Sequence, residues 1–559
     1  MHMNKKALII AALCLLSLAG YSRKEKSAGN VPCNKDITQP AAELYRYLLD
    51  LSLSKAQQEQ LIAGHWLGAS FRKGVADYRF NMGEVVEIRR RSGKWIGMID
   101  GWICPGEFGH KGKKADPIGD CMHYDDMLID YTLWWKNGGI VHVDASFFSP
   151  FDGYFDKRYG GRGNAPIITN IDNILTPGTS EFAQWRKLCD RMVVFFKALE
   201  DRDIPVIFRP FTEAYLGTGF WYAYRRIGPE KFGRLYRDLY DYLTHDKKCN
   251  NILWDFQGDK HYPHYPGDEY VDVLTADSDY VSWNSCCYHN VDPKSNKPSG
   301  NAELGDFGEG PYGKSDFSKT PEKKKSWMSW IEWAKKDAPN LSFYTVWDRN
   351  WSPVKKPDAD FRYPNFDAEY ITVMNDPYLI TRDKITVTPK GASLPYRYAY
   401  RPGNFDLTPG YGSWSVTEKG IACSASDALS TIYIGNMDWT DYAIGTEVKI
   451  PVKGYAGIIG RGVSSDIYYS VEVSANEMAL YRNFVGVRQR LASVTLSAGK
   501  NDAAALSVSF AGAAIKAEAK IGGKSYRCDA NDDSIAAGCA GLVSYFGNPA
   551  VTRFEVKGI

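Results

Sequence analysis

Short apolar runs alternate with longer stretches of helical periodicity between residues 38 and 382, and this alternation limits the folds open to the chain. The runs with the length and composition of buried strands are residues 61–65, 95–100, 140–144, 204–208, 251–256, 270–274 and 341–347. Apolar residues recur at helical spacing over 122–136, 182–199, 229–243 and 323–336. Roughly eight strand–helix repeats predict an α/β fold of the (β/α)8 TIM barrel type. Two irregular stretches, 145–178 and 284–320, are expected to be loops over its face.

The pattern changes at about residue 385. Helical periodicity ends, and short alternating runs bounded by glycine, aspartate and asparagine follow at 433–435, 442–450, 467–473, 504–510 and 541–545. Closely spaced runs of this kind predict an all-β domain of the sandwich type. The expected organisation is therefore a leader and linker over 1–30, a barrel over 38–382 and a sandwich over 385–559.

Residues 1–30 have the pattern of an export leader and linker. A basic pair precedes a short apolar core over residues 7–18, which is too short to span a membrane. Residues 18–20 are similar to a bacterial lipobox, but Tyr21 follows where a lipid-bearing cysteine would stand, so the chain as written cannot be acylated there. We expect a secreted protein of the periplasm or bacterial outer-membrane surface, with a lipoprotein as its native form.

The cysteines suggest disulfides rather than a metal site. Export would permit disulfides among the 11 cysteines. Cys528 and Cys539 are close in sequence within the β-rich region and form one candidate pair, and Cys104 and Cys121 form another. There is no CxxC pair and no HExxH motif, so the sequence predicts no metal site.

Charge and aromatic content narrow the class of ligand. The chain has 68 basic and 66 acidic residues, a net charge of +2, which argues against nucleic acid as a partner. Aromatic residues make up 14% of the chain, including 16 Trp and 36 Tyr. Two explanations fit this aromatic content. One is large hydrophobic cores, and the other is carbohydrate binding, because the apolar faces of sugar rings stack on aromatic rings.

The segment 204–213, IPVIFRPFTE, is the most informative for function. Its first residues suit a buried parallel strand, and Arg209 and Glu213 follow where that strand ends. Parallel barrels carry their chemistry at the carboxyl ends of their strands. Aromatic residues follow at 220–224, and apolar rings beside a carboxyl group raise its pKa and keep it protonated near neutral pH. Glu213 is therefore a candidate acid/base of a glycosidase, with a structural acid paired to Arg209 as the alternative.

Six motifs in sequence order resemble those of glycoside hydrolase family 26, which contains β-mannanases and related retaining enzymes on a (β/α)8 barrel. The motifs are WWKNGGIV at 134–141, DNILTPGT at 172–179, FRPFTE at 208–213, NILW at 251–254, YPGDEYVD at 265–272 and FYTVWDRN at 343–350. The resemblance covers residues 40–380 and implies that Glu213 is the acid/base. The region after 385 resembles instead the concanavalin and laminin-G type of jelly roll, which implies either glycan binding, with a structural calcium ion considered, or support of the barrel.

The departures from the family bear on substrate and mechanism. The family usually has a histidine before the acid/base, where this chain has Thr212, and another beyond the third strand, where it has Ser146. Its nucleophile is a glutamate followed two residues later by glycine at the end of the seventh strand. The match predicted here is Asp306, with Glu303 and Glu309 as alternatives. An aspartate would set the attacking oxygen back by about one C–C bond, which lowers the rate unless the backbone compensates.

Several further residues are predicted to contact substrate. They lie at predicted strand ends or in the aromatic segment, and each has a structural alternative as a core or capping residue. These residues are Arg209, His65, Trp66, Asp100, Ser146, Thr212, Trp221, Tyr222, Trp254 and Trp347.

The predicted function is that of a secreted glycoside hydrolase acting on a β-linked polysaccharide, mannan-type by resemblance. Glu213 and Asp306 would carry out a retaining double displacement without an organic cofactor. A glycan-binding protein on a catalytically decayed barrel and an inverting glycosidase of different substrate are the alternatives. Release of reducing ends from a polysaccharide distinguishes the enzyme from the binding protein.

Overall fold

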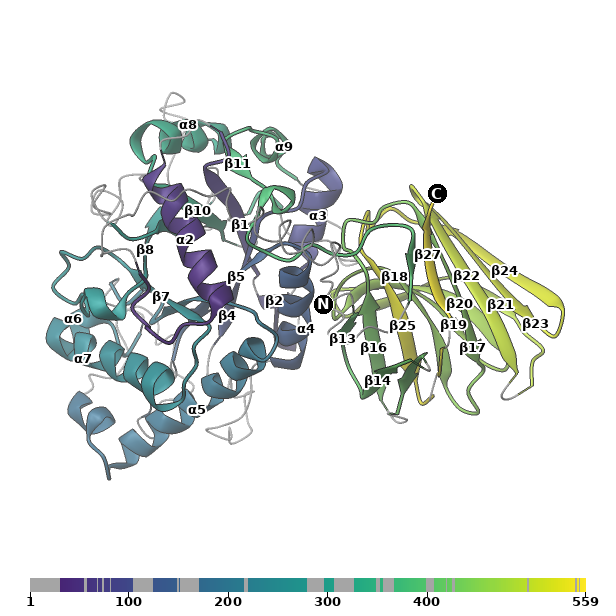
Figure 1. The fold of residues 1–559 in the computed structure, drawn as a ribbon, viewed down its shortest axis with the longest axis horizontal. Helices are drawn as coiled ribbons and strands as arrows, with labels where there is room; N and C mark the ends of the chain where they lie inside the picture. The colour runs from purple at the N-terminus through teal and green to yellow at the C-terminus, as the bar shows by residue number, and fades with distance from the viewer. Residues whose placement is uncertain are drawn as a thin grey trace, which may run out of the picture.

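The computed structural model contains a barrel and a β-sandwich that lie side by side (Figure 1). The residues it describes are 31–54, 58–67, 69–72, 75–80, 82–103, 124–147, 150, 170–215, 220–278, 296–305, 326–347, 352–354, 366–398, 407–418, 420–424, 428–499, 502–547, 550–551 and 553–559. No helix within those segments is both long and apolar enough to cross a membrane.

Eight parallel strands close the barrel, which confirms the predicted fold class. In sheet order they are β1 (Leu61–Leu67), β4 (Met98–Ile103), β5 (Ile140–Ala145), β6 (Val206–Pro210), β7 (Ile252–Gln257), β8 (Val273–Ser278), β9 (Ser299–Leu304) and β10 (Leu341–Val346). β10 pairs with β1 to close the circle, and β11 (Leu379–Ile380) pairs with the start of β1. The carboxyl ends of all eight strands therefore meet at one end of the barrel.

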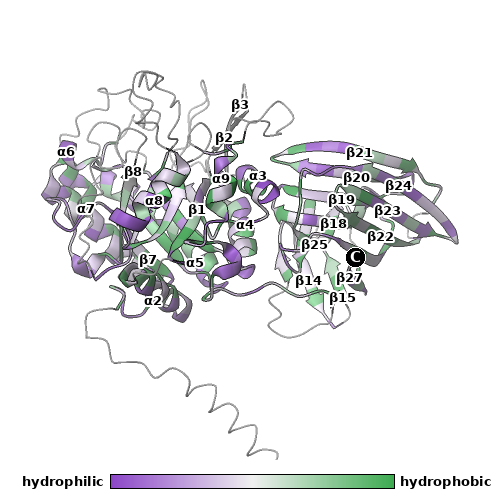
Figure 2. Ribbon diagram, turned by 90° about the horizontal axis from the view of Figure 1, so that it is seen from above, coloured by the Kyte–Doolittle hydropathy of each residue, from purple (hydrophilic) through white to green (hydrophobic). Residues whose placement is uncertain are grey.

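Seven helices surround the described barrel, and a further helix, α2 (Gln39–Leu53), covers the end at which the strands begin. The surrounding helices are α3 (Gly83–Ser92), α4 (Tyr124–Lys136), α5 (Ser180–Glu200), α6 (Tyr224–Ile227), α7 (Pro229–Tyr240), α8 (Trp327–Asp337) and α9 (Glu369–Met374). Figure 2 shows α2 at the opposite end of the barrel from the hairpin of β2 (Ala69–Arg72) and β3 (Val75–Phe80). Since that hairpin follows β1, it marks the end to which the strands point.

The barrel interior changes from apolar to polar along the strands. Near α2 it is filled by a cluster that includes Ile62, Met98, Ile140, Ile207, Leu253, Val273 and Phe343, together with apolar residues of that helix. Side chains two residues further along a strand point to the same side of the sheet. At that next level the buried residues are Gly64, Asp100, His142, Arg209, Asp255, Thr275 and Thr345. Polar side chains so deep in a barrel need partners. Asp255, for example, accepts from Thr275 Oγ1 and faces His142 Nε2, and Asp144 accepts from Arg209.

Two predictions along the barrel were wrong. The seventh strand, β9, lies inside the stretch 284–320 that was expected to be a loop. Its sequence SGNAEL has few of the β-branched and aromatic residues that mark strands, so composition does not reveal it. The sixth strand, β8, begins at Val273, whereas Tyr270 belongs to a short 3-10 turn, Asp268–Tyr270.

The C-terminal region is a sandwich of antiparallel sheets, as predicted. One sheet contains β12 (Tyr396–Arg397), β27 (Phe554–Gly558), β17 (Tyr442–Lys449), β22 (Ala503–Ala511), β23 (Ala514–Ile521) and β24 (Lys524–Asn531). The other contains β13 (Leu407–Pro409), β16 (Leu429–Ile434), β25 (Cys539–Tyr545), β18 (Tyr455–Ser464), β19 (Ile467–Val473), β20 (Glu477–Phe484) and β21 (Val487–Thr495). A smaller sheet contains β14 (Trp414–Thr417), β15 (Gly420–Cys423) and β26 (Ala550–Val551).

The predicted disulfide between Cys528 and Cys539 does not form. Both thiols are free. Cys528 lies on β24 and Cys539 on β25, which belong to different sheets, so closeness in sequence does not bring the sulfur atoms together. Cys104 and Cys121, the other predicted pair, lie outside the described residues.

Candidate active site

Arg209 connects two acidic side chains at the carboxyl ends of the strands. It is on β6, fully buried, and its Nε donates to Asp144 Oδ1 at 2.5 Å. Its Nη2 contacts the other oxygen of Asp144 and also donates to Glu303 Oε1 at 2.7 Å. A guanidinium is a planar fork that fits carboxylates, and such charge-assisted contacts hold both partners in place. Arg209 therefore fixes the position of Glu303 relative to the fourth strand.

Glu303 is the acidic residue that the structure brings next to Arg209. Its side chain is only 13% exposed, and it lies near the end of β9, the seventh barrel strand. The pairing of β9 with β8 shifts register between Asn301 and Glu303, an irregularity that re-aims side chains and is common beside active sites. Asp306 and Glu309, the other predicted nucleophiles, lie outside the described residues.

Glu213 lies in the loop that follows β6, and its side chain is half-buried. Its backbone N–H donates to Gln257 Oε1 at 2.6 Å, which ties the loop to the end of β7. Both Phe211 and Glu213 have positive φ, 61° and 56°, a conformation that non-glycine residues rarely adopt. Backbone strain of this kind concentrates at functional sites, where the surrounding contacts maintain it.

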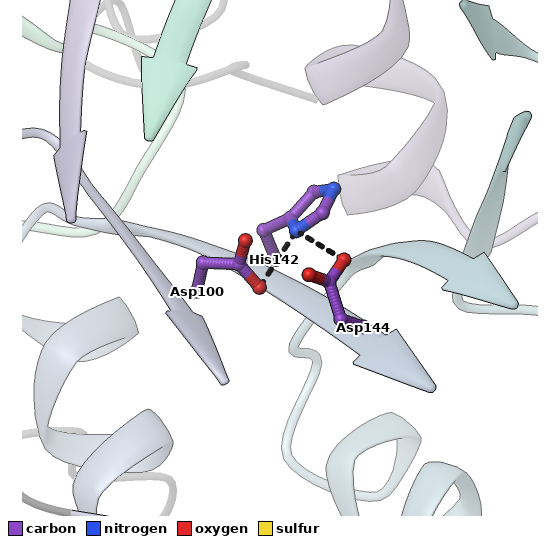
Figure 3. A group of neighbouring side chains, drawn as sticks. All are labelled: Asp100, His142 and Asp144. Carbon is purple, nitrogen blue, oxygen red and sulfur yellow. Dashed lines mark ion pairs between the residues drawn. The ribbon is translucent and has the colours of Figure 1, made fainter. Parts of the chain in front are cut away.

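Asp100, His142 and Asp144 form a buried group of charged side chains, in which both carboxyl groups face the His142 ring (Figure 3). His142 Nδ1 is 2.8 Å from Asp100 Oδ1 and 3.6 Å from Asp144 Oδ1, and His142 Nε2 is 3.1 Å from Asp255 Oδ2. Burial alone would lower the pKa of His142, but the charge of Asp100 and the hydrogen bonds to Asp100 and Asp255 outweigh it and raise that pKa to about 10. Burial raises the pKa of Asp144 above its ordinary value, while Arg209 and His142 oppose that shift.

Three of these side chains have the residue types and spacing of a metal site, and they are the group of this kind among the described residues. One ligand atom from each of Asp100, His142 and Asp144 lies within 4.8 Å of the others. Both oxygens of Asp144 already contact Arg209, however, so a cation here would lie beside a guanidinium. The arrangement can therefore hold either a metal ion or a protonated imidazole.

Aromatic residues line the same end of the barrel. Trp66 stacks on Trp347 with ring centroids 4.1 Å apart and an angle of 11° between planes. Trp102 lies at a tilt to Trp66, 6.2 Å away. Trp102 also donates from Nε1 to Ser146 Oγ at 3.0 Å. Ser146, where a family histidine was expected, thus orients a tryptophan.

Other predicted residues support the loop around Glu213. Trp221 Nε1 donates to the Phe147 carbonyl at 2.8 Å, and Tyr222 Oη donates to the Thr212 carbonyl at 3.0 Å. Thr212 Oγ1 in turn donates to the Ala145 carbonyl at 3.2 Å. All three predicted side chains are buried, so their described contacts are with the protein rather than with solvent.

Trp254 and His65 lie away from this group. Trp254 is fully buried and packs against Phe208 and Tyr240, on the helix side of the sheet. His65 is fully buried too, and its Nε2 faces Ser352 Oγ at 3.1 Å and Glu84 Oε2 at 3.3 Å. Neither residue is brought next to Arg209 or Glu303 by the contacts described.

Sequence reasoning missed His142, Asp255, Gln257 and Trp102 as parts of the site. The signal that identifies them is strand periodicity, since each is two residues from an inward-facing neighbour. His142 is two residues before Asp144, Trp102 is two after Asp100, and Asp255 and Gln257 follow one another on β7.

Comparisons with known proteins show the family to which the barrel belongs. The sequence model described as glycosyl hydrolase family 26 matches residues 34–353, more than half of the chain. Mannan endo-1,4-beta-mannosidase A and B of Caldalkalibacillus mannanilyticus is 27% identical over 433 residues, covering 74% of this chain and 73% of that protein. A mannan endo-1,4-beta-mannosidase of Bacillus subtilis is 24% identical over 376 residues, covering 65% and 94%. Among solved structures, Bacillus subtilis mannanase man26 is similar over 64% of this chain and 98% of its own, at 20% identity and a TM-score of 0.48.

Proposed function

Since the chain belongs to glycosyl hydrolase family 26, we propose that it hydrolyses β-1,4-mannan by a retaining double displacement, with Glu213 as acid/base and Glu303 as nucleophile. The mannan specificity rests on the relatives, which are named as mannan endo-1,4-beta-mannosidases. The mechanism rests on two carboxyl groups, one to protonate the leaving oxygen and one to attack the anomeric carbon.

The contact between Arg209 and Glu303 is the observation that carries this proposal. A nucleophilic carboxylate has to be ionised and fixed in place, and a buried guanidinium 2.7 Å away favours both. Glu303 is followed two residues later by Gly305, as the family pattern requires, and it is the last residue but one of the seventh strand. Glu303 therefore replaces Asp306 as the proposed nucleophile, and a glutamate in this place needs no compensating backbone shift.

The chemistry proceeds in two steps. Glu303 attacks the anomeric carbon while Glu213 donates its proton to the oxygen of the departing sugar, which leaves a glycosyl ester on Glu303. Glu213, now ionised, removes a proton from water, and that water attacks the same carbon and releases Glu303. Trp347 is partly exposed and stacks on the buried Trp66, so we assign it the aromatic surface on which a mannose ring stacks.

The test is hydrolysis of β-1,4-mannan by the purified chain. We expect new reducing ends from mannan, and we expect Glu213→Gln and Glu303→Gln each to lower kcat on the order of 10³-fold or more. Asp306→Asn and Glu309→Gln are the matched controls, since each neutralises a competing carboxylate of the same region. Loss of activity in Asp306→Asn together with an active Glu303→Gln would contradict the assignment.

The stereochemistry of the first product tests the mechanism separately. Proton NMR of the initial product distinguishes the β anomer, expected for retention, from the α anomer, expected for inversion. Binding of mannan with no turnover by the wild-type chain would instead support a glycan-binding protein.

A further inference from the structure

A cavity of about 230 Å³ lies where α3 of the barrel approaches the sandwich (Figure 1). Its wall consists of Arg89, Gly93, Lys94, Trp95, Asp383 and Asp438. Residues 89–95 come from the end of α3 and the turn before β4, whereas residue 383 lies in the 3-10 turn Arg382–Lys384 and residue 438 lies between β16 and β17. Because Trp95 precedes β4, the cavity is at the amino ends of the barrel strands, away from the carboxyl ends where Glu303 lies.

Both carboxylates of the cavity already have a cation of their own. Lys94 Nζ donates to Asp383 Oδ2 at 3.1 Å. Arg382 Nη2 donates to Asp438 Oδ1 at 2.6 Å. These two pairs balance the negative charge of the wall.

Arg89 is the cation of the wall that remains without an anion. Its guanidinium lies 5.7 Å from the centroid of the Trp95 ring and has no ion pair with a described residue. Its Nε is buried and has no hydrogen-bond partner among those residues. Burial lowers the pKa of Arg89, although the charges of Asp438 and Asp383 oppose that shift. Partial burial of a cation that lacks a partner is unfavourable, so an anion at this place would be stabilising.

Lys390 adds to the excess of positive charge in this region. Its Nζ donates to the Ile385 carbonyl at 2.7 Å and has no ion pair with the part of the chain that the structure describes. Burial and the charge of Arg382 lower the pKa of Lys390. Arg89, Lys94, Arg382 and Lys390 are therefore four cations in a region with two carboxylates, Asp383 and Asp438.

Trp95 supplies a neutral donor on the same wall. The residue is 4% exposed, and its Nε1 is buried without a hydrogen-bond partner among the described side chains and backbone. A guanidinium fork binds two oxygens of a carboxylate or phosphate group at once, and an indole N–H can donate to a further oxygen. The groups left without partners at this cavity are therefore all hydrogen-bond donors.

We propose that this cavity binds a small oxyanion, held by the guanidinium of Arg89 with Lys94 and Trp95 beside it. The occupant carries a phosphate or a carboxylate group, and its source is either inorganic phosphate or an acidic sugar. Because the wall comes from α3, the 3-10 turn and the sandwich, the bound anion also stabilises the contact between the two units. This site does not depend on the proposed hydrolysis.

Isothermal titration calorimetry of the full chain tests the proposal with inorganic phosphate and with glucuronate. The background is about 0.15 M sodium chloride, which screens weak contacts with surface charges. We expect one saturable site per chain that requires Arg89. Tighter binding of phosphate identifies the free anion as the occupant, and tighter binding of glucuronate identifies an acidic sugar. Mannose has no charge, so any binding of mannose should be equal in wild type and Arg89→Gln.

Two variants of Arg89 and one matched control locate the site. Arg89→Gln should lower the affinity for the anion at least about tenfold, because the charge and the fork are lost. Arg89→Lys keeps the charge and much of the side-chain volume but not the fork, so it should weaken binding by less, and it serves if Arg89→Gln does not fold. Arg91→Gln removes a charge from the same turn of α3, but Arg91 donates to Glu87 Oε1 at 2.7 Å and is not part of the wall, so binding should match wild type.

Thermal unfolding provides a second readout. An anion that binds only the folded chain raises the unfolding temperature as its concentration increases. We expect this rise in wild type and Arg91→Gln, and its loss in Arg89→Gln.

Three results would overturn the proposal. The first is no saturable binding of either anion to wild type up to about 10 mM. The second is equal affinity for the anion in wild type and both Arg89 variants, or an equal loss in Arg91→Gln. The third is mannose binding that depends on Arg89 as strongly as anion binding does, since the site would then recognise a neutral sugar.

This inference and the proposed function fail in different experiments. A chain that binds the anion through Arg89 but releases no reducing ends from mannan refutes only the proposed function. A chain that hydrolyses mannan and binds neither anion refutes only the anion site.

Discussion

Two buried histidines illustrate how neighbours decide the charge of a residue. His142 lies among carboxylates, and despite its burial their charges raise its pKa to about 10. His264 stacks on Tyr224 with ring centroids 4.0 Å apart and has no hydrogen-bond partner among the described residues. Burial therefore lowers the pKa of His264 to about 4. Sequence alone could not separate the two cases, because the partners of His142 come from other strands.

The neutral His264 makes stability depend on pH. Its pKa is about 4 in the folded chain against about 6.5 when exposed, so between these values the unfolded chain binds more protons. The stability contributed by the neutral ring is fully present above pH 6.5 and is lost as pH falls toward 4. Between pH 7 and pH 4.5 the free energy of unfolding of the wild type should fall by about 2–3 kcal/mol more than that of His264→Phe. Urea denaturation at the two pH values measures both changes.

His245→Gln is the matched control for this comparison, because that histidine is exposed. It should keep the wild-type dependence of stability on pH. If His264→Phe and wild type lose the same stability between the two pH values, His264 takes up its proton in the folded chain and the assigned neutral ring is wrong.

At the scale of the elements, the barrel was predictable because strand and helix periods differ. Runs such as 140–144 and 204–208 became β5 and β6 almost as expected. β9 was not predictable, because its polar sequence and its register shift disguise the period of two. The same difference applies to the site residues. Arg209 and Glu213 lie on a regular strand and its loop, so the sequence predicts them. Glu303 lies on the irregular strand, so the sequence favours Asp306 in its place.

The closure of the barrel between β1 and β10 depends on a glycine. A Cβ on Gly64 would lie 2.5 Å from the Tyr344 carbonyl oxygen and 2.9 Å from the Thr345 Cγ2. Backbone in a paired strand cannot move aside cheaply, so we expect Gly64→Ala to lower the free energy of unfolding by about 1–3 kcal/mol or more. Urea denaturation measures this change.

Gly445 on β17 provides the matched control for Gly64. It is also a strand glycine, but a Cβ there meets nothing within 4 Å. Gly445→Ala should be neutral or slightly stabilising, since alanine reduces the freedom of the unfolded chain. Equal stability of Gly64→Ala and Gly445→Ala would show that the β1–β10 pairing is looser than the contacts indicate.

At the scale of the whole molecule, barrel and sandwich are joined by specific polar contacts. Asp130 on α4 accepts from the backbone N–H of Ser465 at 2.6 Å, and Asn137 Oδ1 accepts from the backbone N–H of Met437 at 2.9 Å. Lys136 Nζ donates to the Leu407 carbonyl at 2.8 Å. Side chains of the barrel thus satisfy backbone groups of the sandwich, which fixes one unit against the other. We call this set of contacts between barrel and sandwich the seam. The sequence predicts the two units but not the seam, because the residues that meet there are hundreds of positions apart in the chain.

Arg382 is the side chain on which this seam depends most. It is 1% exposed, its guanidinium lies 4.8 Å from the ring of Trp95 and 4.9 Å from that of Trp134, and its Nη2 donates to Asp438 Oδ1 at 2.6 Å. Arg382→Ala removes the stacking, the ion pair and the filled space between two rings, so we expect a loss of about 2–4 kcal/mol. Calorimetry should show one cooperative transition in wild type and a lower, broadened or divided transition in Arg382→Ala.

Arg397→Ala is the control for an arginine without this packing, because 73% of that side chain is exposed and its partner Glu555 belongs to the sandwich itself. A surface ion pair of this kind contributes about 0–1 kcal/mol to the free energy of unfolding. The thermal transition of Arg397→Ala should therefore match that of the wild type. If wild type already unfolds in two steps and Arg382→Ala shifts only the barrel step, the sandwich does not stabilise the barrel. A single step that moves as a whole means instead that burial of Arg382 makes the two units unfold together.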